Sequence, residues 1–258
     1  IAYKKRIDAF NREYSSQKIK ASAQFTARTG GASAYETDLM NKLVEGTLPD
    51  IITYDAPYCA SYANSGLLYD ITSLLSEETK NDFITLSTYD NKVYGLPIQE
   101  SSAGFYYNVS LFEQAGIDMN EIKSYTAENP WTFDQFKAVC QKLKNANITP
   151  VDMRLDATKD ETAPYMLYPF IYASGGSFTS ADGKTANGYM NSEKSVNGFK
   201  FLKELYTEGY TSYSIGATDF FTGKVGMYLS SGWTIPDIDT KFKTTFPDRS
   251  SWGILPYP

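Results

Sequence analysis

Short apolar runs alternate with segments of helical periodicity along most of the chain, and this alternation restricts the possible folds more than any other feature. Near the start, Tyr3, Ile7, Phe10 and Tyr14 recur at the spacing of one helix face. The run at residues 50–54 has the composition of a buried strand. Because strands and helices that alternate in this way form sheets covered by helices, we predict an α/β fold.

The alternation begins again after Asn108. Thr132 and Gln135 have the spacing of a capping box, which predicts a helix that starts beside Trp131. Ser192 predicts the start of a later helix, whose expected inward residues are Val196, Phe199, Leu202 and Leu205. Two such α/β units predict two lobes, residues 1–105 and 106–258, each with a mostly parallel sheet flanked by helices.

The predicted boundary at residues 104–108 is an extended crossing between the lobes rather than a flexible linker. The stretch before it, GLPIQESSAGFYYN, carries Gln99, Glu100, Ser101 and Ser102 between apolar residues. Burying such groups without partners costs several kcal/mol. They therefore lie on a surface loop or face a cleft that a polar ligand fills. Because ligands of open α/β sheets bind beyond the strand ends, we expect a cleft between the lobes.

The composition restricts the chemistry that the chain can perform. It contains no histidine, which removes Ser-His and Cys-His pairs and the commonest metal ligand. Its two cysteines, Cys59 and Cys140, have no metal-ligand spacing, and we expect buried free thiols rather than a disulfide. The net charge of -6, with scattered basic residues, argues against nucleic acid as a partner. We predict no metal, no cofactor and no catalytic residue.

Five stretches together resemble one known family in their order and spacing: LVEGTLPDIITYDAPYCASYANSGLL, KVYGLPIQESSAGFYYNVSLFEQAGI, NPWTFDQF, YPFIYASGG and FTGKVGMYLSSGWTIP. The chain is similar to the extracytoplasmic solute-binding proteins of carbohydrate ATP-binding-cassette (ABC) importers, which include the maltose-binding proteins. The resemblance implies a type II periplasmic-binding-protein fold, hinge closure over a sugar, and delivery to a membrane permease. It also implies a monomer that is periplasmic or a lipid-anchored lipoprotein at the surface of a Gram-positive cell. Relative to that family pattern, the first strand and the C-terminal return segments are missing, so a fragment is expected.

A sugar offers hydroxyl groups to carboxylates and amides, and C–H faces to aromatic rings. Trp233 follows Ser-Ser-Gly, which has little bulk to hide an indole, and the matching family turn places this ring under the sugar. The resemblance also implies ligand contact for Glu100, within a residue of a family glutamate, and for Tyr165. We expect the remaining ligand contacts from Tyr54, Asp55, Gln99 and Arg154. Asp55 could instead cap the next helix, and Arg154 could pair with neighbouring aspartates.

Three functions compete at this stage. We favour a binding protein that captures a carbohydrate, in particular an oligosaccharide. The alternative from another class is a glycoside-cleaving enzyme with Asp55 and Glu100 as its carboxylate pair. In the third hypothesis the fold is the same, and the ligand is a phosphorylated polyol instead of a sugar. That ligand requires clustered basic residues, and Arg154 is the candidate in the predicted cleft.

Overall fold

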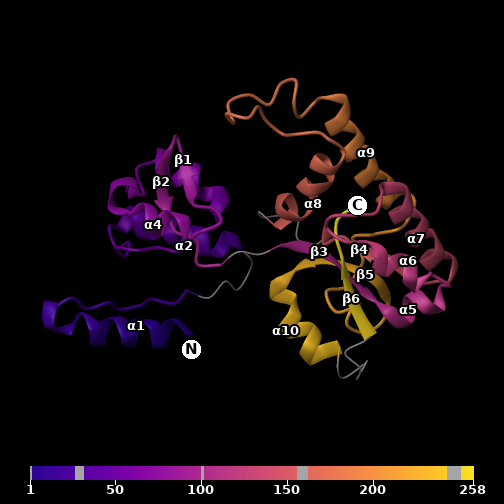
Figure 1. Ribbon diagram of the computed structural model, residues 1–258, viewed down its shortest axis with the longest axis horizontal. Coiled ribbons are helices and arrows are strands. Elements are labelled where there is room, and N and C mark those ends of the chain that lie inside the picture. Colours follow the sequence, from indigo (N-terminus) through magenta and orange to yellow (C-terminus); the bar gives the residue numbers. More distant parts are fainter. Residues whose placement is uncertain (1, 27–31, 100–101, 156–161, 243–250) are drawn as a thin grey trace. The chain divides into compact units, whose positions relative to one another are not determined.

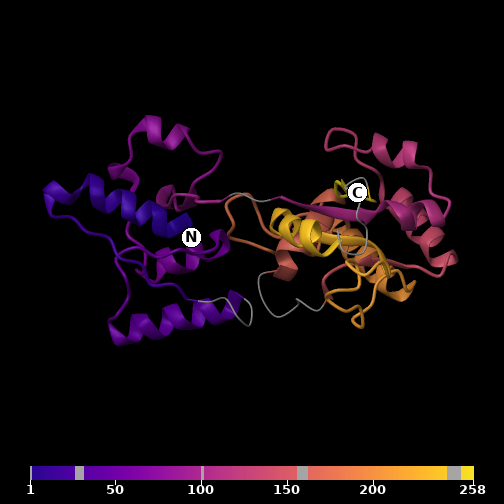
Figure 2. The same ribbon diagram turned by 90° about the horizontal axis from the view of Figure 1, so that it is seen from below.

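The computed structural model describes residues 2–26, 32–99, 102–155, 162–242 and 251–258. The chain divides into two compact units, residues 1–53 and 54–258. The first unit contains helix α1 (Ala2–Glu13), the 3-10 helix η1 (Ser15–Gln17) and helix α2 (Ala32–Glu45) (Figures 1 and 2). The helix predicted from the Tyr3–Tyr14 periodicity is α1. The predicted lobe boundary at residues 104–108 stays a prediction.

The strand predicted at residues 50–54 is wrong. These residues have no strand structure, and the side chain of Ile51 is 87% exposed. A segment with the composition of a strand forms one only where a neighbouring strand supplies hydrogen bonds. The sheets of the described residues are β1-β2 and β4-β5-β3-β6, and neither includes this run.

Residues 54–99 form short helices and one hairpin. The helical segments are η2 (Ala56–Tyr58), α3 (Cys59–Asn64), η3 (Thr72–Leu74) and α4 (Glu77–Asn81). Strands β1 (Ser87–Tyr89) and β2 (Lys92–Gly95) pair antiparallel. Their turn places Asp90 and Asn91 at φ 48° and 60°, a left-handed conformation that these two residue types tolerate well.

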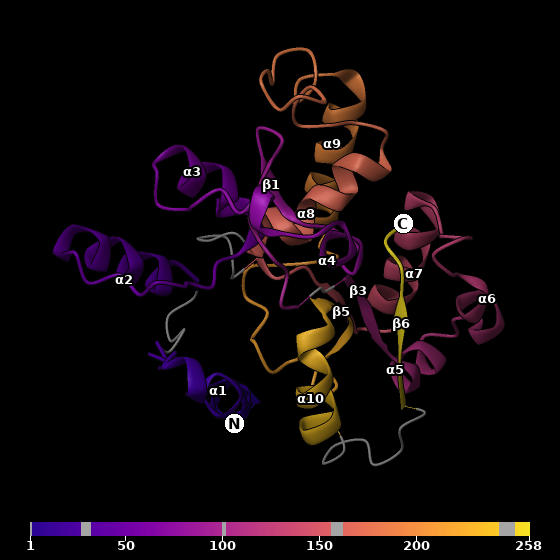
Figure 3. The ribbon, with the colours of Figure 1, turned by 60° about the vertical axis from the view of Figure 1, so that its left-hand side comes forward.

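A four-stranded sheet with the order β4-β5-β3-β6 organises the rest of the chain. Figure 1 labels its strands, and Figure 3 gives a second view of β3, β5 and β6. Its strands are β3 (Ala103–Asn108), β4 (Thr149–Asp152), β5 (Val225–Ser231) and β6 (Trp252–Leu255). β4 and β5 pair parallel, whereas β3 pairs antiparallel with both β5 and β6. The α/β class is confirmed, but this sheet is mixed rather than mostly parallel. The difference arises because β3 lies between two strands that run opposite to it.

Among the described residues of this part, five α-helices precede β5, and three short helical segments come directly after it. The five are α5 (Val109–Gln114), α6 (Met119–Ser124), α7 (Phe133–Asn145), α8 (Thr162–Ala173) and α9 (Glu193–Thr207). The three are η5 (Gly232–Thr234), α10 (Ile235–Asp237) and the π-helix η6 (Ile238–Phe242), coloured yellow in Figure 2. α7 starts with the predicted capping box of Thr132 and Gln135. In the described part of the chain, no helix combines the length and apolar character needed to cross a membrane.

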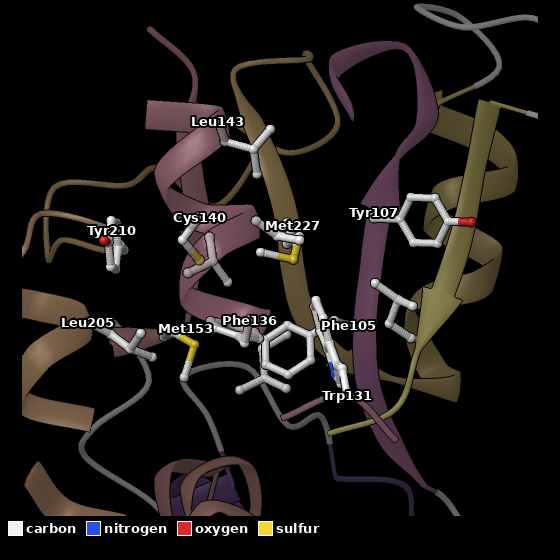
Figure 4. Packing of buried hydrophobic residues seen from close by; sticks show 14 of the residues in the cluster. Phe105, Tyr107, Trp131, Phe136, Cys140, Leu143, Met153, Leu205, Tyr210 and Met227 are labelled. Atoms are coloured by element: carbon white, nitrogen blue, oxygen red, sulfur yellow. The ribbon is translucent and has the colours of Figure 1, made fainter. Parts of the chain in front are cut away.

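Residues of β3 alternate between two hydrophobic clusters, as the period of a strand requires. Phe105 and Tyr107 belong to the larger cluster with Phe136 and Leu143 of α7, and Figure 4 shows the four side chains on β3 and α7. Tyr106 belongs to a smaller cluster with Phe220, Phe221, Val225, Tyr228 and Ile238. All three aromatic residues of β3 are therefore core.

The two cysteines are buried free thiols, as predicted. The side chain of Cys140 is fully buried in the larger cluster (Figure 4), and burial raises the pKa of its thiol well above the ordinary value. Cys59 is 4% exposed, and its sulfur lies 3.7 Å from the hydroxyl oxygen of Tyr54.

Candidate functional site

Tyr54 and Asp55 immediately precede η2 in the chain. Tyr54 is half-buried against the ring of Tyr62, with a centroid separation of 5.9 Å, and burial raises the pKa of Tyr54 to about 12. Asp55 occupies the N-cap position of η2, but its side chain makes no capping hydrogen bond. Its carbonyl oxygen instead accepts from the N–H of Tyr58 at 2.9 Å. The predicted alternative, that the Asp55 carboxylate caps this helix, is therefore wrong.

The polar stretch before β3 is only partly described. Gln99 is exposed, at the end of the segment that follows β2. Glu100 lies outside the described residues. The roles of both residues in a ligand site stay predictions.

Tyr165 and Trp233 lie 68 positions apart in the sequence, and the fold brings their rings together. Tyr165 comes from the first turn of α8 and Trp233 from η5, immediately after β5. The ring centroids are 5.8 Å apart, with an interplanar angle of 37°. The side chains are 37% and 46% exposed, so both rings present surface to solvent. Both residues are among those for which the family resemblance implies ligand contact, so we take this pair as the centre of the candidate site.

Arg154 lies just beyond the end of β4 and binds within the protein. Its Nη1 donates to the hydroxyl oxygen of Tyr228 at 2.9 Å, and its guanidinium lies 5.7 Å from the centroid of that ring. Its backbone N–H donates to Oδ1 of Asp152 at 2.8 Å. The guanidinium is therefore held beside β5, the strand that leads to Trp233.

The sequence did not predict that the hydroxyl groups of Tyr228 and Tyr106 form hydrogen bonds near the turn that carries Trp233. The hydroxyl of Tyr106 donates to the carbonyl oxygen of Ser231 at 2.9 Å, and both tyrosines are buried. Their sequence signal was weak because tyrosine in a buried strand usually serves packing. Only the pairing of β3 with β5 shows that these hydroxyl groups act on the turn that carries Trp233.

The arrangement suits a ligand with apolar faces and hydroxyl edges. Two partly exposed rings offer stacking surface, and tyrosine hydroxyls both donate and accept hydrogen bonds. Within the described ranges, no group of three or more His, Cys, Asp or Glu side chains could hold a metal ion. A depression of about 460 Å³ between α7 and α9 is lined by none of the predicted residues, and Lys137 forms ion pairs there with Asp134 and Glu204.

Comparison with known proteins gives a family and a fold. A family model described as "Bacterial extracellular solute-binding protein" matches residues 1–258. A putative binding protein of Brucella abortus (strain 2308) is 26% identical over 231 residues, which are 85% of this chain and 52% of that protein. The chain therefore spans about half the length of the curated relatives that it matches.

Two solved structures show the same fold as the chain. One is a cyclic α-maltosyl-1,6-maltose binding protein from Arthrobacter globiformis, with a TM-score of 0.74 and 22% identity over 100% of this chain and 62% of that one. The other is UgpB from Mycobacterium tuberculosis in complex with glycerophosphocholine, with a TM-score of 0.75 and 17% identity over 100% of this chain and 61% of that one. At these identities the likeness concerns the fold, which confirms the type II periplasmic-binding-protein prediction.

Proposed function

The chain belongs to the bacterial extracellular solute-binding proteins, and from this premise we propose that it is part of the substrate-binding component of an ABC importer. Its ligand is a carbohydrate, in particular an oligosaccharide, which the protein passes to a membrane permease. Membership of this family also gives an extracytoplasmic location, whereas a lipid anchor stays a prediction. The family consists of binding proteins, so the glycoside-cleaving alternative has no support.

One observation carries the sugar proposal: the exposed ring pair of Tyr165 and Trp233. Stacking rings combine with hydrogen-bonding groups in sugar sites, because a pyranose has both C–H faces and hydroxyl edges. We assign the stacking to Trp233 and Tyr165, and the hydrogen bonds to Tyr54, Asp55, Gln99 and Glu100. Capture then follows from closure of two lobes about residues 104–108, since only the closed form contacts the ligand from both sides.

A phosphorylated polyol is the second candidate, because the UgpB structure with its glycerophosphocholine shares the fold. Such a ligand needs free basic groups around its phosphate. Arg154, the basic residue proposed for this role, already donates to Tyr228. The geometry therefore favours a neutral sugar.

Binding should be measured by calorimetry with maltooligosaccharides, their monosaccharide and glycerophosphocholine. We expect saturable binding of an oligosaccharide, and chromatography of the mixture should show no shortened product. Trp233→Ala should weaken binding at least about tenfold, which is about 1.4 kcal/mol, because the platform is lost. Tyr206→Ala, an exposed tyrosine on α9, is the matched control and should leave affinity unchanged.

Three results would contradict the proposal. Tighter binding of glycerophosphocholine than of any sugar would favour the polyol ligand. Released sugar would favour the enzyme. Equal affinity of the wild type and Trp233→Ala would remove the ring pair from the site.

A further inference from the structure

Trp233 combines an exposed ring with a buried backbone attachment. Its side chain is 46% exposed, whereas Ser231 and Thr234, on either side of it, are 1% and 3% exposed. A stacking platform binds more tightly if its orientation is fixed before the ligand arrives, because ordering a mobile side chain on binding costs conformational entropy. The residues that anchor this turn therefore contribute to ligand affinity by fixing the orientation of the Trp233 ring.

Two hydrogen-bonding contacts hold the turn that carries Trp233. The hydroxyl groups of Ser230 and Thr234 are hydrogen-bonded to each other, so they join the end of β5 to the end of η5 across Trp233. The hydroxyl of Tyr106, from the neighbouring strand β3, donates to the carbonyl oxygen of Ser231 at 2.9 Å. Both contacts are buried, so breaking either one leaves an unsatisfied polar group away from water, which is unfavourable.

The contacts continue from Ser230 to the end of β4. The Tyr228 side chain interacts with that of Ser230 and accepts from Nη1 of Arg154 at 2.9 Å. Its ring is stacked on Phe220, with centroids 5.4 Å apart and an interplanar angle of 18°. Arg154 has a φ of 55°, a conformation uncommon outside glycine, and its backbone N–H is held by Asp152.

We propose that Arg154, Tyr228, Ser230, Thr234 and Tyr106 form a hydrogen-bonded clamp that fixes the orientation of Trp233, and that Arg154 acts as a positioning residue rather than a ligand contact. This inference rests on the proposed role of Trp233 as a stacking platform. It replaces the ligand contact expected of Arg154 with an action through Tyr228 and Ser230. It also gives Thr234 and Tyr228 a role in ligand affinity without contact to the ligand.

The test uses the purified protein with its tryptophans replaced biosynthetically by 5-fluorotryptophan. The chain has three tryptophans, Trp131, Trp233 and Trp252, so fluorine NMR gives one line for each, and Trp233→Phe assigns its line. Thr234→Val keeps the shape of the side chain and removes the hydroxyl group. We expect it to shift and broaden the Trp233 line while the line of the buried Trp131 stays in place.

Thr234→Ser retains the hydroxyl group and should restore the line position. Tyr228→Phe removes a single oxygen atom and should act in the same direction as Thr234→Val, while Tyr206→Phe on α9 is the matched control without effect. In calorimetry with the oligosaccharide that binds the wild type, Thr234→Val should lower affinity about tenfold or more, and Thr234→Ser should recover most of it.

The fluorine readout needs no ligand, which separates this inference from the proposed function. A protein that binds no sugar but whose Trp233 line responds to Thr234→Val and Tyr228→Phe contradicts the function and leaves the clamp intact. An unchanged Trp233 line in both variants overturns the clamp, whatever the protein binds. If Thr234→Val alters the Trp131 line as well, the core has changed, and Tyr228→Phe decides the matter.

Discussion

Individual side chains of the candidate site differ in how far the sequence could predict them. Trp233 was predicted from the small residues of its turn and from the family resemblance, and Tyr165 from the resemblance alone. The fold places their rings in contact. The role of Arg154 could not be predicted in the same way. Its partner Tyr228 lies 74 positions further along the chain, and only the parallel pairing of β4 with β5 brings the two together.

The two thiols give a prediction at the same scale. Cys59 and Cys140 are buried, and burial raises the pKa of Cys140. Because the thiolate is the reactive form, we expect neither thiol to react rapidly with Ellman's reagent in the native protein at mildly alkaline pH. In concentrated guanidinium chloride both should react at once. Rapid native reaction, or fewer than two thiols after denaturation, would contradict the buried free thiols described here.

Helix starts were more predictable than helix faces. The capping boxes and N-caps depend on residues three positions apart, which the sequence displays directly. The inward face of α9 depends on its neighbour: Val196 and Phe199 were expected inside but are 37% and 39% exposed. The buried residues include Ser195, which hydrogen-bonds to Ser177 and Tyr189, and Gly198, which packs on α8.

The small size of Gly198 explains why the apolar pattern misled. A Cβ at this position would lie 2.9 Å from the Cα of Ile171 in α8, closer than real Cβ atoms come. Close approach of two helices requires a small residue at the contact, and hydrophobicity does not reveal one. A pattern of apolar residues therefore does not predict a helix face that is buried because its residues are small.

The capping box of α7 gives a prediction at the scale of one element. Oγ1 of Thr132 accepts from the N–H of Gln135 at 3.2 Å, and Oε1 of Gln135 accepts from the N–H of Thr132 at 2.8 Å. Thr132→Ala should lower the free energy of unfolding by about 1 kcal/mol, measured by urea denaturation. Thr132→Ser keeps the hydroxyl group and should lose much less. Equal losses in the two variants would show that the hydroxyl group does not stabilise the helix.

At the scale of the whole molecule, family and fold class could be predicted, because ordered motifs extend over most of the chain and the family model matches all of it. The relative direction of the strands could not be predicted from the sequence. Alternation of strands and helices predicts crossovers, but it does not say that β3 pairs with two strands that run opposite to it. Such pairings join residues more than a hundred positions apart and leave no local signal.

The absence of histidine has a consequence for the stability of the whole protein. Carboxylates titrate below about pH 5 and tyrosines above about pH 9, so the free energy of unfolding should be nearly constant between about pH 6 and 8. Burial raises the pKa of Tyr54 to about 12 and also raises the pKa values of Tyr106, Tyr107 and Tyr228 above 10.0.

In the unfolded chain these phenols titrate near the ordinary pKa of 10.0. Above that pH the unfolded chain binds fewer protons than the folded protein, so the free energy of unfolding falls as pH rises. The contribution of the buried tyrosines is therefore complete below about pH 10 and is lost as pH passes through their raised pKa values. Urea denaturation followed by circular dichroism across this range tests both parts. A stability transition near neutral pH, or a protein that becomes more stable as its tyrosines ionise, would show that groups other than these phenols control the pH response.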